Sequence, residues 1–214
     1  MFIIELLLAL PIIFMSLSLH EAAHAFVANK LGDPTAKNLG RLSLNPMKHI
    51  DPIGFLCMLI AGFGWAKPVP ITSRNFKKPR RDMALSAIAG PVSNLLLATV
   101  FAALMKLFFI FLKNVPLSNS EFTGNVITIV YIFLFSGISM NITLAVFNLI
   151  PVPPLDGSRF FYILLPTKYY FGIMRYERYI YLGLMVLLFV GALDPAIDFV
   201  SNGLMGVLFK IFAM

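Results

Sequence analysis

The stretch MFIIELLLALPIIFMSLSLHEAAHAFVANKLGD, residues 1–33, joins a long apolar run to the polar sequence HEAAH at residues 20–24. About 20 apolar residues suffice for a helix to cross a bilayer. Ionisable groups inside such a helix cost free energy, so two histidines and a glutamate there need a reason. The run lacks the basic start and the small-residue cleavage site of a signal peptide, and we interpret it as retained.

The composition is that of an integral membrane protein. Of the 214 residues, 59% are hydrophobic and only 13% are charged, well outside the balance of a soluble domain. We therefore predict an all-α polytopic membrane protein with about four transmembrane helices, and we expect the last apolar stretch, residues 203–214, to be too short to cross upright. The predicted spans are residues 2–28, 83–112, 126–150 and 179–200.

Basic residues gather in three segments of the chain. Of the 17 Lys and Arg residues, four lie within residues 30–48, six within 67–81 and four within 159–178. The loop between the second and third spans holds only Lys113. The positive-inside rule places the three basic segments in the cytoplasm and the N-terminus outside. The net charge of +7 then reflects topology, and no basic stripe indicates nucleic acid.

The apolar sequence IGFLCMLIAGFGW, Ile53 to Trp65, has basic segments on both sides. Both of its ends should therefore face the cytoplasm, so we expect it to dip into the membrane and return. Non-helical backbone at that depth has to be covered by protein or line a watery cavity. The alternative is a short helix that lies in the membrane interface.

The HEAAH sequence has the spacing of a zinc site. His20 and His24 are four residues apart, so on a helix both imidazoles lie over one face and can bind one metal ion. Glu21 lies next to the same position, and this is the placement of a general base that takes a proton from water at the metal. The alternative is a set of polar residues at a helix interface, but the apolar surroundings favour the metal site.

A catalytic zinc takes three protein ligands, so a third has to come from elsewhere in the chain. His49 precedes Asp51 at a turn, and we expect it to cap or position that turn. Asp156 differs from the other acidic residues because it follows three prolines in the string FNLIPVPPLDG, residues 147–157. Prolines end a helix, and an unwound segment can bring a short carboxylate to a metal. A plain proline-rich loop is the alternative.

Five motifs in this order resemble the site-2 protease family of intramembrane zinc metalloproteases. They are HEAAH, SLNPMKHIDPIG at 43–54, GWAKPVP at 64–70, AGPVSN at 89–94 and NLIPVPPLDG at 148–157. The resemblance covers about Ser18 to Arg159. It implies three core helices with a β-hairpin or re-entrant segment after the first, and a short form without a PDZ or CBS domain.

The resemblance also implies the roles of the site residues. His20, His24 and Asp156 would bind zinc, one ion per chain, with Glu21 as the catalytic acid/base. Asn148 would support the substrate or the oxyanion.

These expectations describe one intramembrane metalloprotease domain over residues 1–214, with a catalytic core of about 2–166 and C-terminal helices at 179–214. It would sit in the plasma membrane, surrounded by lipid bilayer, and cleave the transmembrane helices of client proteins or signal-peptide remnants; its oligomeric state is left open. His20 lies ten residues before Lys30, about 15 Å below the cytoplasmic edge.

Two other classes of protein compete with the protease. A metal or proton transporter would show broken helices in two similar halves, and the sequence has no internal repeat. An inactive membrane scaffold would have lost one of the three expected zinc ligands or the expected acid/base, and all four of these residues are present.

Overall fold

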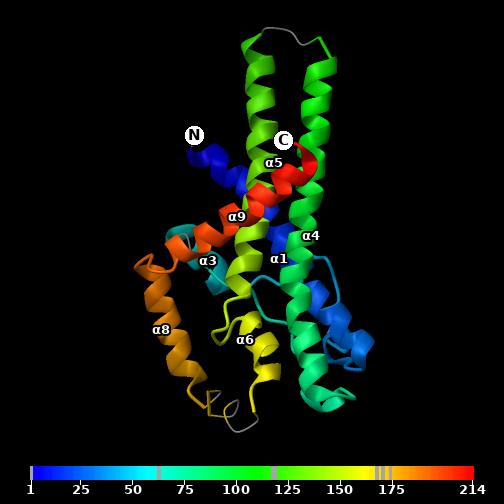
Figure 1. Ribbon diagram of the computed structural model, residues 1–214, viewed down its shortest axis with the longest axis vertical. Helices are drawn as coiled ribbons and strands as arrows, with labels where there is room; N and C mark the ends of the chain where they lie inside the picture. The colour runs from blue at the N-terminus through cyan, green and yellow to red at the C-terminus, as the bar shows by residue number, and fades with distance from the viewer. Residues whose placement is uncertain (1, 62–63, 117–119, 167–168, 170–171, 174) are drawn as a thin grey trace.

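The computed structural model describes residues 2–61, 64–116, 120–166, 169, 172–173 and 175–214, and Figure 1 shows their arrangement. Over these residues the chain is helical and forms no β-strand. In chain order the helices are α1 (Phe2–Leu31), α2 (Thr35–Asn38), η1 (Pro46–Lys48), α3 (Pro52–Ala61), η2 (Ser73–Asn75), α4 (Pro79–Asn114), α5 (Glu121–Asn148), α6 (Asp156–Phe161), η3 (Tyr162–Leu164), α8 (Glu177–Phe189) and α9 (Asp194–Phe212), where η denotes a 3₁₀ helix.

Four of the described helices are long and apolar enough to cross a membrane: α1 from Leu7, α4, α5 and α9. This confirms the prediction of an all-α, multi-pass membrane protein. At 1.5 Å per residue, the 36 residues of α4 extend about 54 Å, beyond the roughly 30 Å of a bilayer core. Figure 1 shows α4 and α5 side by side along the long axis of the molecule, with α9 crossing them.

The predicted fourth span, residues 179–200, is wrong. The helix α8 ends at Phe189 after 13 residues, which extend only about 20 Å. Gly191 then adopts a left-handed φ of 69°, a conformation that glycine takes without steric cost, and this ends the helix. Pro195 in the first turn of α9 starts a second helix, because proline suits that position. The fourth candidate span is therefore α9, which includes most of the stretch that we expected to be too short.

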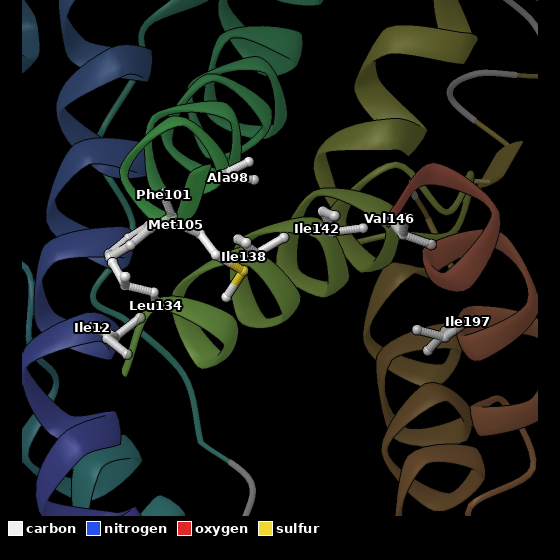
Figure 2. Packing of buried hydrophobic residues seen from close by; sticks show 10 residues of the cluster. Ile12, Ala98, Phe101, Met105, Leu134, Ile138, Ile142, Val146 and Ile197 are labelled. Atoms are coloured by element: carbon white, nitrogen blue, oxygen red, sulfur yellow. The ribbon is translucent and has the colours of Figure 1, made fainter. Parts of the chain in front are cut away.

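The largest apolar cluster joins α1, α4, α5 and α9. Figure 2 shows its members: Ile12, Ala98, Phe101, Ala102, Met105, Leu134, Ile138, Ile142, Val146 and Ile197. The helices α4 and α5 come close because Gly137 has no side chain: a Cβ at that position would lie 2.5 Å from the Phe101 ring. This packing fixes α4 against α5 and so places the polar residues of both helices near α1.

The segment predicted as a re-entrant loop or β-hairpin is helical over Pro52–Ala61, and residues 62–63 lie outside the described residues. The side chain of Asp51 starts this helix, since its Oδ1 accepts hydrogen bonds from the amides of Ile53 (3.0 Å) and Gly54 (2.8 Å). An isolated antiparallel bridge joins Ile50 to Ala66. The chain thus returns to the place where the segment began, and its entry into the membrane stays a prediction.

The helix α5 ends at Asn148, and the next helix, α6, begins at Asp156. The intervening residues contain Pro151, Pro153 and Pro154, which lack the amide hydrogens that a helix needs. The expected unwinding before Asp156 is confirmed. Because α6 packs against α4, the carboxylate at its start is directed back towards the helix pair α1 and α4.

Candidate metal centre

Two histidines of one helix turn meet a carboxylate from a distant part of the chain. Oδ2 of Asp156 lies 3.0 Å from Nε2 of His20 and 3.1 Å from Nε2 of His24. One potential ligand atom from each of the three residues lies within 4.8 Å of the others, and the residues that the structure describes hold no second group of this kind. The structure therefore brings together the three residues that the sequence suggested as ligands.

The other ring nitrogen of each histidine is held by α4. Nδ1 of His24 lies 2.7 Å from the Ser86 carbonyl oxygen, and Nδ1 of His20 lies 2.5 Å from Oδ1 of Asn94. A backbone carbonyl can only accept, so Nδ1 of His24 carries a hydrogen, and Nε2 is the ring atom left to bind a metal. Metal-binding histidines are commonly fixed by such contacts.

Gly90 leaves the space in which the two histidines lie. A Cβ at this position would collide with Nε2 of His24 and would lie 2.6 Å from Cε1 of His20. The two imidazole rings stand edge to face, with centroids 4.6 Å apart. Only glycine lets the α4 backbone approach both rings this closely.

The chemistry of this group fits zinc. Two imidazole nitrogens and one carboxylate oxygen are a ligand set that zinc accepts, and three protein ligands leave a position for water. Both histidines are buried, at 6% exposure each. Buried polar groups so close to one another are expensive unless they share a partner such as a cation.

Glu21 is buried beside the group but is not a member of it. Its Oε2 accepts a hydrogen bond of 2.9 Å from the backbone amide of Val69. Proline has no amide hydrogen, so between Pro68 and Pro70 the amide of Val69 is the one backbone donor. The extended segment after α3 therefore fixes one oxygen of the carboxylate that the sequence suggested as the base.

Asn148 is not brought to the group by any hydrogen bond of the described residues. It is the last residue of α5, and its Nδ2 donates to the Leu144 carbonyl oxygen at 2.9 Å. Its role towards a substrate or an oxyanion stays a prediction.

His49 lies away from the group and holds a loop together. Its Nε2 lies 2.7 Å from the Ser43 carbonyl oxygen, and its own carbonyl oxygen accepts from the Lys67 amide at 2.8 Å. These contacts are those of the positioning residue that we expected.

The comparisons with known proteins identify the family. The model of peptidase family M50 matches residues 8–191. The chain belongs to peptidase family M50. The M50 members are zinc metalloproteases, so this protein is a multi-pass membrane protein of the zinc metalloprotease class.

Relatives of this M50 protein occur in bacteria and archaea. It is 43% identical to YwhC of Bacillus subtilis, named as a candidate zinc metalloprotease, over 175 residues that are 82% of this chain and 77% of YwhC. It is 32% identical over 148 residues to Rip2 of Mycolicibacterium smegmatis, also named as a candidate zinc metalloprotease, which covers 67% of this chain and 51% of Rip2. The archaeal zinc metalloprotease MJ0392 of Methanocaldococcus jannaschii is 27% identical over 158 residues, 74% of this chain and 34% of that protein. No solved structure matches significantly.

The sequence reasoning assigned no role to the residues that hold the two histidines of this M50 site, although the motif AGPVSN at 89–94 contains Gly90 and Asn94. Ser86, Gly90 and Asn94 are four residues apart, so they lie on one face of α4, and this spacing is the signal that could have pointed to them. Asn141 on α5 carries no such signal.

Proposed function

We propose that this protein hydrolyses peptide bonds in transmembrane or membrane-associated segments of client proteins, within the bilayer. The observation that carries the proposal is the convergence of His20, His24 and Asp156 beside Glu21, inside a helix long and apolar enough to cross a membrane. His20 lies 11 residues before the end of α1 at Leu31, which is about 16 Å along the helix. A peptide bond cut there lies at membrane depth.

His20, His24 and Asp156 would hold the metal through the two Nε2 atoms and Oδ2. A bound zinc ion supplies a Lewis acid and lowers the pKa of water towards neutrality. The buried surroundings strengthen the electrostatic effect of every charge in the site.

Glu21 would move the proton. The Val69 amide holds Oε2, and we assign Oε1 to accept a proton from the attacking water and return it to the departing amine nitrogen. Asn148 would donate its amide to the substrate or to the developing oxyanion. In that role its side chain turns away from the Leu144 carbonyl oxygen.

A membrane segment as substrate is supported by an apolar cavity beside the site. Its volume is about 390 Å³ and it lies between α1, the segment around α3, and α5. Leu17, one turn before Glu21, lines it together with Phe55, Trp65 and Phe147. Apolar side chains of an unwound client helix, or of a signal-peptide remnant, would find a favourable environment there.

One way for an extended client segment to bind is to add a strand to an exposed sheet edge. The described residues between Arg41 and Pro70 form one isolated bridge and no strand, and Pro68 and Pro70 have no amide hydrogens to offer. Access past α3 and α5 fits the cavity better. The proposed location is the plasma membrane, with the N-terminus outside and the site towards the cytoplasmic side, as the basic segments indicate.

The test measures zinc content and client cleavage on the same purified samples. His20→Ala, His24→Ala and Asp156→Ala should lose zinc and activity, because a three-ligand site does not survive with two. Glu21→Gln should keep zinc while kcat falls by about 10² to 10⁴, the usual value of acid/base help. Asn148→Ala should keep zinc and lose about 10² to 10³ in kcat, as for one oxyanion donor.

Two outcomes would overturn the proposal. If a Glu21→Gln protein cleaves a detergent-solubilised client at the wild-type rate, the proposed mechanism is wrong. A transporter or a scaffold would then be the preferred interpretation of the protein. Full zinc content in Asp156→Ala would show that the third ligand is a different residue.

A further inference from the structure

A chain of buried side-chain hydrogen bonds runs from His20 into α5. Nδ1 of His20 lies 2.5 Å from Oδ1 of Asn94, and Nδ2 of Asn94 donates to Oδ1 of Asn141 at 3.0 Å. Nδ2 of Asn141 in turn donates to the Gly137 carbonyl oxygen at 2.8 Å. Asn94 and Asn141 are 1% and 0% exposed, so solvent does not compete for these bonds.

The last hydrogen bond of this series determines which group donates and which accepts in all the others. The Gly137 carbonyl can only accept, so the amide nitrogen of Asn141 has to face it. Oδ1 of Asn141 then faces Asn94 and takes a hydrogen from its Nδ2. The remaining atom of Asn94 is Oδ1, an acceptor, and it faces His20. Nδ1 of His20 therefore carries a hydrogen, and Nε2 is the atom that would give its lone pair to a bound metal.

That lone pair points to the place where a metal would be. Nε2 of His20 is the atom 3.0 Å from Oδ2 of Asp156. On the same face of α4, Ser86 fixes His24 in the same tautomer, and Gly90 between them gives the rings room. Asn94 thus completes a row of three residues that serve the two histidines.

We propose that Asn94, oriented by Asn141, is a positioning residue that keeps His20 in the Nδ1–H tautomer and directs its Nε2 to the metal. This rests on the proposed function only in taking His20 as a zinc ligand. Two buried amides cost free energy unless they are hydrogen-bonded, and here each side-chain oxygen and nitrogen of the two has a partner, which favours one arrangement of the imidazole.

The experiment uses the full-length protein and four variants. Asn94→Leu removes the acceptor at similar volume, Asn94→Asp keeps an acceptor oxygen, and Asn141→Leu removes the group that orients Asn94. The control is Asn114→Leu on the same helix, whose exposed amide donates to the Ile110 carbonyl oxygen of its own turn. The zinc dissociation constant is measured by competition with a chelator.

The order of hydrogen bonds from His20 to Asn141 predicts how zinc affinity should differ between the variants. Asn94→Leu should weaken zinc binding about 10- to 100-fold, the usual effect of losing a partner of a metal-binding histidine. Asn141→Leu should weaken it less, because Asn94 stays in place. Asn94→Asp should recover the affinity that Asn94→Leu loses, and Asn114→Leu should match the wild type.

A second readout needs no metal. The chain has three histidines, so nitrogen-15 labelling of histidine gives few signals, and the zinc-free protein should show a hydrogen on Nδ1 of His20. Asn94→Leu should turn this signal into a mixture, while those of His24 and His49 stay unchanged. Asn141→Leu should shift the same signal even if Asn94→Leu fails to fold.

The proposal is overturned if Asn94→Leu binds zinc as tightly as the wild type, or if the wild-type His20 signal is the Nε2–H tautomer. Retention of zinc by His20→Ala would contradict the ligand assignment of the proposed function instead. The tautomer of His20 in the zinc-free protein would still test the hydrogen-bond chain.

Discussion

Gly90 determines how closely α4 approaches the two histidines of α1. Its missing side chain leaves room for both imidazoles, and its neighbours on the same helix face, Ser86 and Asn94, hold their Nδ1 atoms. One methyl group at this position would have to displace the ring atoms themselves. The site is therefore sensitive to a change smaller than the loss of a ligand.

Gly90→Ala should disturb the metal centre more than the fold. Overpacking of this kind costs about 1–3 kcal/mol, and here the strain falls on His20 and His24. We expect weaker zinc binding, measured by chelator competition. Gly183→Ala in α8 is the matched control, because nothing lies within 4 Å of its added Cβ; it should keep zinc affinity and gain about 0.5–1 kcal/mol of stability. Unchanged zinc affinity in Gly90→Ala would contradict the steric argument.

The sequence allowed prediction of residues whose chemistry is rare in a membrane helix. His20, Glu21 and His24 stand out because ionisable groups are expensive there, and Asp156 because it follows three prolines. Asn94 and Asn141 could not be assigned in this way. The role of a side-chain amide in a helix depends on its hydrogen-bond partner on another helix, and that pairing depends on how α4 and α5 pack.

At the scale of elements, the loop after α1 is fastened to the segment before α4. The buried carboxylate of Asp33 accepts from the amides of Thr35 (3.1 Å) and Thr72 (2.7 Å) and from Nδ2 of Asn75 (2.7 Å). The hydroxyl of Thr35 donates to it as well. The fastened segment also carries Val69, whose amide holds Glu21. Asp33 thus indirectly supports Glu21, the proposed general base.

The stability of this junction should depend on pH. Burial alone would raise the pKa of Asp33, but hydrogen bonds from Thr35, Asn75 and Thr72 outweigh it and lower the pKa below its ordinary value. A lowered pKa in the folded state means that Asp33 contributes stability above its unfolded pKa, and that this contribution is lost as pH falls through the folded value. Thermal unfolding of the wild type and of Asp33→Asn should differ at neutral pH and converge in acid. Parallel curves down to acid pH would assign the pH dependence to other groups.

The ends of the helices could be predicted from the sequence only where a clear local signal marked them. The prolines after Asn148 made the end of α5 predictable. The break at Gly191 was hidden in an apolar stretch, because a glycine ends a helix only if it takes a left-handed φ, and hydropathy does not report that choice. The helix at Pro52–Ala61 rests on the cap from Asp51, a contact that flanking charge does not reveal.

For the whole molecule, orientation in the membrane can be tested with cysteine labelling. In a Cys57→Ser background, which removes the single native cysteine, a cysteine at Ser120 should react with an impermeant reagent from outside. Cysteines at Lys37 and Lys77 should react only after the membrane is permeabilised, because the positive-inside rule predicts that the basic segments lie in the cytoplasm. Labelling of Lys77→Cys in intact cells would show that the segment around α3 crosses the membrane.

His20 and Asp156 meet in the site although they lie far apart in the sequence, and this separation has a consequence for biosynthesis. Under the proposed ligand set, the first ligand, His20, leaves the ribosome 136 residues before the third, Asp156. At 5–20 residues per second, that interval is on the order of ten seconds. During this time the HEAAH helix sits in the membrane among other nascent chains without a complete centre. Under the proposed function, the protein is thus unable to cut membrane segments until α5 has been inserted and the chain has turned back.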